Sequence, residues 1–246
     1  MKPGYKEIGR VRQLCRYVVK GMAGESLDQV KVGWNGLLGD RRYALQRIGN
    51  RSGLPFASAR ELPALTLYTA SFRNPLDVDR GGVSITTPTG EVFDLYDPAW
   101  LPELEAGRGE KLDVISLWRG AFDSMPVSLI SDRSVHSIEE LVGQQLEVAR
   151  FRPNIVVEAL EPKAFPEDRW VGELLVFGDD SEAARIRANR KDLRCGVVDV
   201  NPATGKKDCD ILANVVRTRK NFLGIYGTTE RPGLVRLGDT VYTVDR

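Results

Sequence analysis

A single thiol follows a run of cationic side chains in the last quarter of the chain. Cys195 comes directly after residues 185–194, RIRANRKDLR, which contain five Lys and Arg residues. Nearby positive charge favours the thiolate, the form of cysteine that binds metals or attacks electrophiles. The same cations suit a phosphate or another anion. This pattern predicts a site that holds an anionic, phosphate-bearing cofactor and brings a thiolate to its metal.

The same residue types also fit an inert cysteine beside a solvated basic strand. Buried, unreactive cysteines are common, so composition alone favours this second interpretation. His136 is the only histidine, which argues against a His-rich metal site and against most Ser-His or Cys-His catalysts. The other cysteines, Cys15 and Cys209, form no Cys-x-x-Cys pair with Cys195, so a structural zinc site is not expected.

The overall charge excludes a strongly basic protein. Lys and Arg total 35, Asp and Glu total 34, and the net charge is +1, so no basic excess points to nucleic acid. No apolar run approaches the roughly 20 residues that span a bilayer, and the polar residues 1–7 lack a signal-peptide core. Three cysteines do not suggest a disulfide scaffold. We therefore predict a cytoplasmic protein without a membrane span.

The hydrophobic pattern predicts a mainly β fold with a few short helices. Residues 83–87 and 91–95 alternate around Pro-Thr-Gly, which indicates a hairpin. A second hairpin is predicted for residues 43–48 and 56–59, with a Gly- and Asn-containing turn at 49–53. Residues 97–112, with two prolines and two glycines, are expected to form a short helix or loop near a subdomain boundary.

One helix is predicted after a strand at residues 127–130. The apolar residues of 135–142 recur with a spacing of about 3.6 residues. Ser131 or Ser134 can cap its first turn, and Gly143 is well placed to end it.

Several segments around Cys195 resemble the MOSC family, which is related to the C-terminal region of molybdenum-cofactor sulfurases. Residues 194–205, RCGVVDVNPATG, are similar to its Arg-Cys…Asp-Pro-x-Thr-Gly signature, and residues 151–157, FRPNIVV, to its Phe-Arg-Pro-Asn-Ile-Val segment. Residues 165–175 contain the acidic-x-Trp pattern followed by a Leu-rich strand. The terminal residues 232–242, PGLVRLGDTVY, also fit the family.

The first half of the chain resembles the β-barrel domain that precedes MOSC in amidoxime-reducing proteins. Residues 17–20, YVVK, stand where that family has Tyr-Pro-Val-Lys. Residues 39–43, GDRRY, resemble its Asp-Arg-aromatic segment, and Ala59-Arg60 follows the predicted hairpin as expected. The resemblance implies an N-terminal MOSC-type β-barrel domain over residues 1–115 and a C-terminal MOSC β-barrel domain over residues 116–246.

This resemblance implies a molybdenum–molybdopterin cofactor with Cys195 as the protein ligand to the metal. The helix N-terminus after Ser131 is also physically suited to a phosphate. The positions that match cofactor-binding residues of the family are Lys20, Arg41, Ser131, Ser134, Arg152, Asn154 and Arg194.

The chain departs from the family pattern at a few of these segments. Val18 replaces the usual Pro, Gly21 stands where Ser often follows the Lys, and Leu193 replaces a small polar residue. Asp199 replaces a hydroxyl residue four positions after the cysteine. An acid this close to the metal is a candidate for catalytic proton transfer, and an ion pair with a neighbouring arginine is the alternative.

The resemblance implies an oxidoreductase that reduces N-hydroxylated or related small-molecule substrates. The chain has no clustered cysteines for an iron–sulfur centre and no flavin motif. A separate electron-transfer protein of the ferredoxin, flavoprotein or cytochrome type is therefore expected. Two alternatives remain open, namely a carrier of molybdenum cofactor or sulfur without turnover, and a metal-free MOSC protein that binds an anion.

Overall fold

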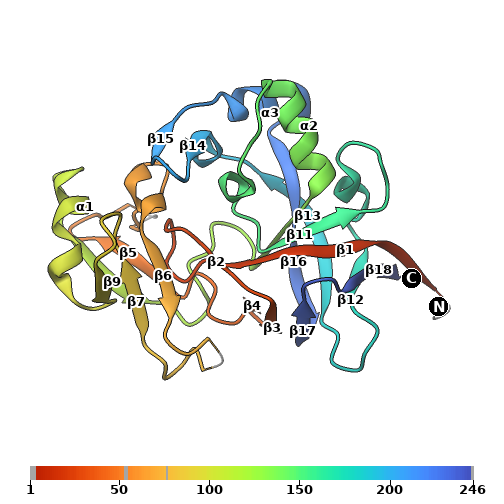
Figure 1. The fold of residues 1–246 in the computed structure, drawn as a ribbon, viewed down its shortest axis with the longest axis horizontal. Coiled ribbons are helices and arrows are strands. Elements are labelled where there is room, and N and C mark those ends of the chain that lie inside the picture. Colours follow the sequence, from red (N-terminus) through yellow and green to blue (C-terminus); the bar gives the residue numbers. More distant parts are fainter. Residues whose placement is uncertain (1–3, 53–54, 76, 245–246) are drawn as a thin grey trace.

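The computed structural model describes residues 4–52, 55–75 and 77–244 of the chain (Figure 1). Strands dominate, which confirms the predicted fold class. The strands are β1 (Tyr5–Arg16), β2 (Glu25–Ser26), β3 (Gln29–Gly33), β4 (Gly36–Leu37), β5 (Tyr43–Arg47), β6 (Thr69–Phe72), β7 (Val83–Thr86), β8 (Val92–Asp94), β9 (Leu112–Ser116), β10 (Val127–Ser131), β11 (Ile155–Ala159), β12 (Leu174–Phe177), β13 (Arg185–Leu193), β14 (Val200–Asn201), β15 (Lys206–Lys207), β16 (Phe222–Arg231), β17 (Gly233–Arg236) and β18 (Thr240–Val244). The α-helices are α1 (Pro102–Ala106), α2 (Asp132–Val142) and α3 (Ile211–Arg219).

The largest sheet closes into a barrel. Its order is β11-β10-β16-β13-β12-β18-β1-β2, and β1 also pairs with β11. Only β10 and β11 run parallel among the strand pairs described for this sheet. Alternate side chains point inward along the strands and form one apolar core that includes Val11, Leu129, Ile186 and Ile225. Helices α2 and α3 lie together over one side of this barrel (Figure 1).

A close backbone approach inside β1 explains one of its glycines. Gly9 lies opposite Ala159 of β11 on one side and Val241 of β18 on the other. A Cβ atom at Gly9 would lie 2.3 Å from the carbonyl oxygen of Glu158. Only glycine lets the two strands come this close without displacement of the backbone.

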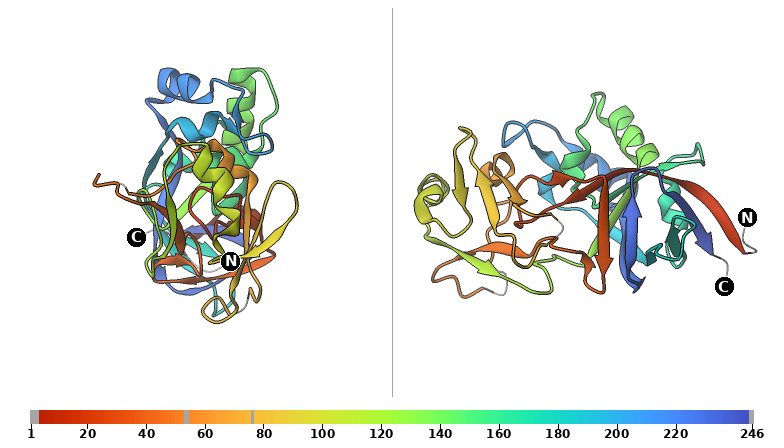
Figure 2. Two further views of the ribbon diagram at one scale, coloured as in Figure 1. Left: turned by 90° about the vertical axis from the view of Figure 1, so that its left-hand side faces the viewer. Right: turned by 60° about the horizontal axis from the view of Figure 1, so that its bottom comes forward.

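The residues between β4 and β10 form smaller sheets around a second core. Strand β5 pairs with β9, and β6, β7 and β8 form a three-stranded sheet. Leu45, Leu65, Ile85 and Trp100 are buried in this core. The pairing of β7 with β8 confirms the hairpin predicted for residues 83–95. Figure 2 shows these sheets at one end of an elongated molecule, with the large barrel at the other.

The hairpin predicted for residues 43–59 has a smaller extent than expected. Gln46 forms an antiparallel bridge with Phe56, and the Ala57 N–H donates to the carbonyl of Leu45 at 2.7 Å. The main partner of β5 is instead β9, a strand that the sequence pattern did not predict. Within the predicted turn, Gly53 lies outside the described residues, as do residues 1–3 of the polar N-terminal stretch.

Helix α2 begins and ends as the sequence predicts. The hydroxyl of Ser131 accepts a hydrogen bond from the Ser134 N–H, so Ser131 is the N-cap. Gly143 follows the last turn with a left-handed φ of 75°, a conformation that favours glycine at a helix end. Val135 and Ile138 point to the interior.

Strands from both sides of the predicted boundary at residue 115 share sheets. Strand β1 belongs to the large barrel, and β3 pairs with β17 near the C-terminal end. The division into residues 1–115 and 116–246 stays a prediction. No helix within the described residues has the length and apolar character required to cross a membrane.

Candidate functional site

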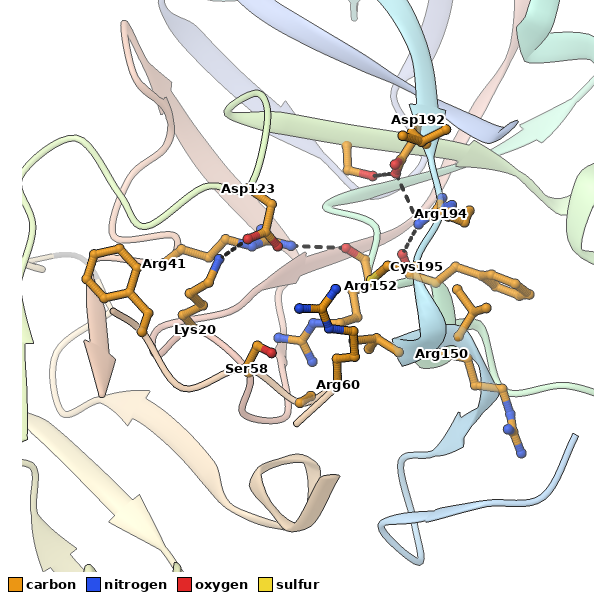
Figure 3. A pocket seen from close by; sticks show the side chains of 18 of the residues that line it. Lys20, Arg41, Ser58, Arg60, Asp123, Arg150, Arg152, Asp192, Arg194 and Cys195 are labelled. Carbon is orange, nitrogen blue, oxygen red and sulfur yellow. Dashed lines mark hydrogen bonds and ion pairs between the residues drawn. The ribbon is translucent and has the colours of Figure 1, made fainter. Parts of the chain in front are cut away.

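A cavity of about 540 Å³ lies between the large barrel and the smaller sheets (Figure 3). Five of the residues predicted from the sequence line it: Lys20, Arg41, Arg152, Arg194 and Cys195. They come from segments up to 175 positions apart, as Lys20 and Cys195 illustrate. The fold therefore places the predicted thiol and most of the predicted cations around one cavity.

Cys195 connects the end of β13 to a short 3₁₀ turn at Gly196–Asp199. Its backbone is extended, and the residue is exposed with a free thiol. Cys15 and Cys209 are also free but do not line the cavity. Within residues 4–52, 55–75 and 77–244, no three His, Cys, Asp or Glu side chains cluster closely enough to hold a metal ion.

Arg41 and Arg152 both pack on the ring of one tyrosine. Their guanidinium carbons lie 4.7 and 4.3 Å from the centre of the Tyr17 ring, a cation–π arrangement. Both arginines have left-handed backbones, with φ of 47° and 51°. Such conformations cost energy in residues other than glycine and often occur at functional sites.

The two arginines differ in their partners. Arg41 forms an ion pair with the buried carboxylate of Asp40 and donates to the Arg152 carbonyl at 3.2 Å. Arg152 has no ion pair or side-chain hydrogen bond with the described residues, and its Nη2 atom is buried without a partner. Burial lowers the pKa of Arg152, and the positive charge of Arg41 adds to this effect while Tyr17 opposes it. Arg152 is thus a cation in the cavity wall that lacks a counter-ion.

Lys20 is buried, but its ammonium group is satisfied. Its Nζ donates to the Ala121 carbonyl at 2.8 Å and to Asp123 Oδ1 at 2.6 Å. Burial lowers the pKa of Lys20, and the carboxylate of Asp123 opposes this shift. The Asp123 side chain is 75% exposed, so this partner can exchange for another anion at a small cost.

Arg194 is bound mainly to its own protein. Its guanidinium donates to the carbonyls of Leu223 at 2.6 Å and Phe151 at 2.7 Å, and it lies 3.0 Å from Asp192 Oδ2. The Arg194 and Asp192 side chains are both buried. Most of the N–H donors of Arg194 are therefore used in contacts within the cavity wall.

Asn154 lies next to the cavity wall and supports Arg41. Its Oδ1 accepts from the Ser128 N–H at 3.0 Å and from Arg41 Nη1 at 3.5 Å. Its Nδ2 donates to the Cys15 carbonyl at 3.2 Å. Asn154 does not line the main cavity but lines a smaller one beside it.

Ser131 and Ser134 lie away from the cavity. Their hydroxyls donate to Glu167 Oε2 at 2.6 and 2.7 Å, and all three side chains are fully buried. Burial raises the pKa of Glu167, while the two hydroxyls oppose this shift. A carboxyl group of the protein therefore occupies the turn where the sequence suggested a phosphate, and the serines are not brought together with Cys195.

Asp199 also lies outside the cavity wall. Its Oδ1 accepts a hydrogen bond from the Leu212 N–H at 2.8 Å, at the start of α3. The Asp199 backbone carbonyl accepts a hydrogen bond from Arg150 Nη1 at 3.5 Å. Among the described interactions, the Asp199 carboxylate forms no ion pair with an arginine. A role of Asp199 in proton transfer therefore stays a prediction, and the structure does not place this residue in the cavity wall.

Several residues that line the cavity are not predicted from the sequence, namely Ser58, Asp123, Arg150, Asp192 and Tyr226. Arg60, part of the Ala59-Arg60 match, also lines the cavity, is exposed, and has no ion pair among the described contacts. Arg150 forms a bidentate pair with Asp208 at 2.7 and 3.0 Å. Asp192 lies three positions before Cys195 within the basic segment, and this lone acid is the signal that could have identified it.

Family comparisons agree with this architecture. The MOSC domain model matches residues 118–242, and the MOSC N-terminal beta barrel domain model matches residues 8–98. The chain belongs to the MOSC domain family. This confirms the predicted family and its pairing of an N-terminal β-barrel domain with a MOSC domain.

Curated relatives and a solved structure are similar to parts or all of this MOSC protein. Mitochondrial amidoxime reducing component 2 of Rattus norvegicus is 32% identical over 133 residues, which is 49% of this chain and 37% of that protein. Mitochondrial amidoxime-reducing component 1 of Homo sapiens is 28% identical over the same shares. The matched segment thus spans just over a third of these relatives. The YuaD protein from Bacillus subtilis covers 98% of this chain with a TM-score of 0.50 and 14% identity, which shows a shared fold.

Proposed function

We propose that this MOSC protein binds a molybdenum–molybdopterin cofactor and reduces N-hydroxylated or related N–O substrates. The observation that carries the proposal is the pairing of an exposed Cys195 thiol with the unpartnered Arg152 guanidinium in one cavity. Arg152 is half-buried, and its buried Nη2 atom has no partner; leaving such a group without an anion is costly, and an anionic ligand would remove that cost. The relatives named for amidoxime reduction support the reaction type.

The residues present fit this cofactor. Cys195 would ligate the metal, and Arg152 and Arg41, which both pack on the Tyr17 ring, would bind the pterin or its phosphate. Lys20 would join them by exchanging its exposed partner Asp123. The seven Lys and Arg residues of the wall exceed its three acids, which suits a phosphate-bearing ligand. When bound, the cofactor supplies the two-electron chemistry that breaking an N–O bond requires.

Two further residues, Asn154 and Arg194, would position these groups. Asn154 holds the Arg41 side chain through Oδ1 and fixes its distance from β10. Arg194 ties β13 to the carbonyls of Leu223 and Phe151 and so fixes the start of the Cys195 turn. Electrons would come from a separate electron-transfer protein.

Metal content and amidoxime reduction test this function. The protein, produced in cells that make the cofactor, is expected to contain molybdenum and to reduce benzamidoxime with an artificial donor such as reduced viologen. Cys195→Ala should lower both by at least about 100-fold, because it removes the metal ligand. Cys209→Ala is the matched control, since this half-buried thiol packs in another core.

Three results would contradict the proposal in different ways. Molybdenum without turnover would indicate a cofactor or sulfur carrier. Absence of molybdenum would indicate a metal-free anion-binding protein. Full metal content and activity in Cys195→Ala would show that the ligand assignment is wrong.

A further inference from the structure

A second, smaller cavity lies against the wall of the main one. Its volume is about 30 Å³, and roughly 10–15 Å³ of such space is enough for one water molecule. Both cavities share Arg41, Asp123, Ser128 and Tyr226. The side chains of the small cavity are Arg41, Phe122, Asp123, Met125, Ser128, Asn154 and Tyr226. Its polar groups provide the two to four partners that a buried water needs.

Side-chain contacts connect this small cavity to an acid in the main one. Ser128 of β10 lies directly opposite Tyr226 of β16. The Ser128 hydroxyl donates to Asp192 Oδ2 at 3.4 Å, and the Tyr226 side chain lies close enough to this carboxylate to interact with it electrostatically. Asp192 lines the main cavity but not the small one. These contacts therefore extend from the small cavity to the main one.

The backbone places Asp192 at an irregularity. The register of β13 against β16 shifts between Lys191 and Leu193, on either side of Asp192. Such bulges redirect a side chain and are frequent beside active sites. Asp192 is only 2% exposed, although it lies one residue before the C-terminal end of β13.

The surroundings of Asp192 and Tyr226 favour the protonated form of both side chains. Burial raises the pKa of Asp192, while Arg194, Tyr226, Ser128 and Arg41 oppose the shift. Burial and the negative charge of Asp192 raise the pKa of Tyr226, so its hydroxyl stays protonated. The arginines of the wall cannot replace these groups as donors, because guanidinium does not release its proton in proteins.

We propose that the small cavity holds water and that Tyr226, Ser128 and Asp192 form a proton relay from it to the substrate space beside Cys195. Asp123, which lines both cavities and has an exposed side chain, connects the small cavity to solvent. This inference rests on the proposed function, in which Lys20 is engaged by the cofactor.

The proposed reaction requires such a supply of protons. Reduction of an N-hydroxylated group breaks the N–O bond and consumes two electrons and two protons. One proton completes the new N–H bond, and the other completes the water that leaves. The electrons come from the separate electron-transfer protein or from an artificial donor, and the relay delivers the protons to the nitrogen and the departing oxygen.

Tyr226→Phe tests the relay, because it removes one hydroxyl and leaves the Asp192–Arg194 ion pair in place. The loaded enzyme is reduced in advance and mixed with benzamidoxime in a single turnover, so that electron delivery does not limit the rate. The rate is expected to fall about tenfold or more, with a larger solvent deuterium effect. Metal content and benzamidoxime affinity should not change.

Tyr242→Phe is the matched control. Tyr242 donates its hydroxyl to an aspartate, Asp179, at 3.1 Å, but it does not line either cavity. Its variant should retain the wild-type rate. An active enzyme in which Tyr226→Phe has the wild-type rate and isotope effect would overturn the relay.

A crystal structure of the metal-free protein gives a readout that does not depend on activity. We expect ordered water within hydrogen-bond distance of Tyr226 Oη and Ser128 Oγ in the small cavity. A dry cavity, or one filled by a side chain, would overturn the water site. A wild-type protein without molybdenum or turnover would instead contradict the proposed function, whatever the small cavity contains.

Discussion

Arg152 and Arg194 line one cavity, but they serve opposite purposes. Arg194 has two backbone carbonyls and the Asp192 carboxylate as partners, whereas Arg152 has only the face of Tyr17. A buried charge with partners supports the fold, and removal of one partner is costly. Arg152 is half-buried with an unpartnered Nη2 atom, and a partly desolvated charge without partners weakens the fold, which a bound ligand would explain.

Arg152→Met and Arg194→Met should therefore separate binding from stability. In metal-free protein, Arg152→Met is expected to leave the free energy of unfolding unchanged or raise it, while molybdenum content falls about tenfold or more. Arg194→Met should lower the free energy of unfolding by about 3–5 kcal/mol, because Asp192 loses its counter-ion. Urea unfolding and metal analysis measure both effects. Equal destabilisation by the two variants would contradict this distinction.

Local sequence was sufficient to predict some residues of the cavity wall and not others. Cys195, Arg152, Lys20 and Arg41 sit in short motifs, and the fold places them in one cavity. For Ser131 and Ser134 the helix cap was predicted, but their distant partner Glu167 was not visible in the sequence. Cavity residues such as Asp192 and Tyr226 depend on strand register, which no local pattern specifies.

At the scale of elements, a buried acid connects the start of α2 to a 3₁₀ turn at Pro166–Arg169. Glu167 accepts hydrogen bonds from Ser131 and Ser134, while its Oε1 atom is buried without a partner. Its raised pKa means that the folded protein binds this proton more tightly than the unfolded chain. The stability from this group is fully present below the unfolded pKa of about 4.3 and is lost as the pH rises through the folded pKa.

Glu167→Gln should remove this pH dependence. Glutamine retains an oxygen that can accept from the two serines but cannot ionise. Between pH 5 and pH 8, the free energy of unfolding should decline more in the wild type than in the variant, by at least about 1 kcal/mol. Urea unfolding of both metal-free proteins at the two pH values measures the difference. Parallel pH profiles would show that Glu167 does not titrate in this way.

The end of α2 gives a second element-scale prediction. Gly143 has a left-handed φ of 75°, and a Cβ atom added at this position would meet no other atom within 4 Å. Any effect of Gly143→Ala should therefore come from backbone strain, at a cost of about 1 kcal/mol. Gly143→Asn should cost less, because asparagine tolerates this conformation. Equal unfolding free energies for the two variants would contradict this cause.

At the scale of the whole molecule, one strand joins parts of the chain that are far apart. β1 pairs with β11 and β18, and together these contacts close the large barrel. Residues 8–19 mix polar and apolar side chains with β-branched ones, which is typical of a strand but does not specify which strands it would join. Pairing between the two ends of a chain depends on tertiary packing, and local propensity does not specify it.

Residues 116–246 alone should therefore not fold cooperatively, although they contain the whole segment that matches the MOSC domain. Without β1, strands β11 and β18 would have unpaired edges facing each other across an open barrel. Circular dichroism and urea unfolding of this fragment should show no cooperative transition. A well-folded fragment would show instead that the boundary at residue 115 separates independent units.

The position of β1 also bears on how the chain is made. Tyr5 to Arg10 pair with Thr240 to Val244, so β1 leaves the ribosome well before its partner strand β18. Translation at about 5–20 residues per second leaves β1 without this partner for roughly ten seconds or more. Barrel closure then follows the synthesis of β18, and chaperones that shield free strands should favour the yield of folded protein.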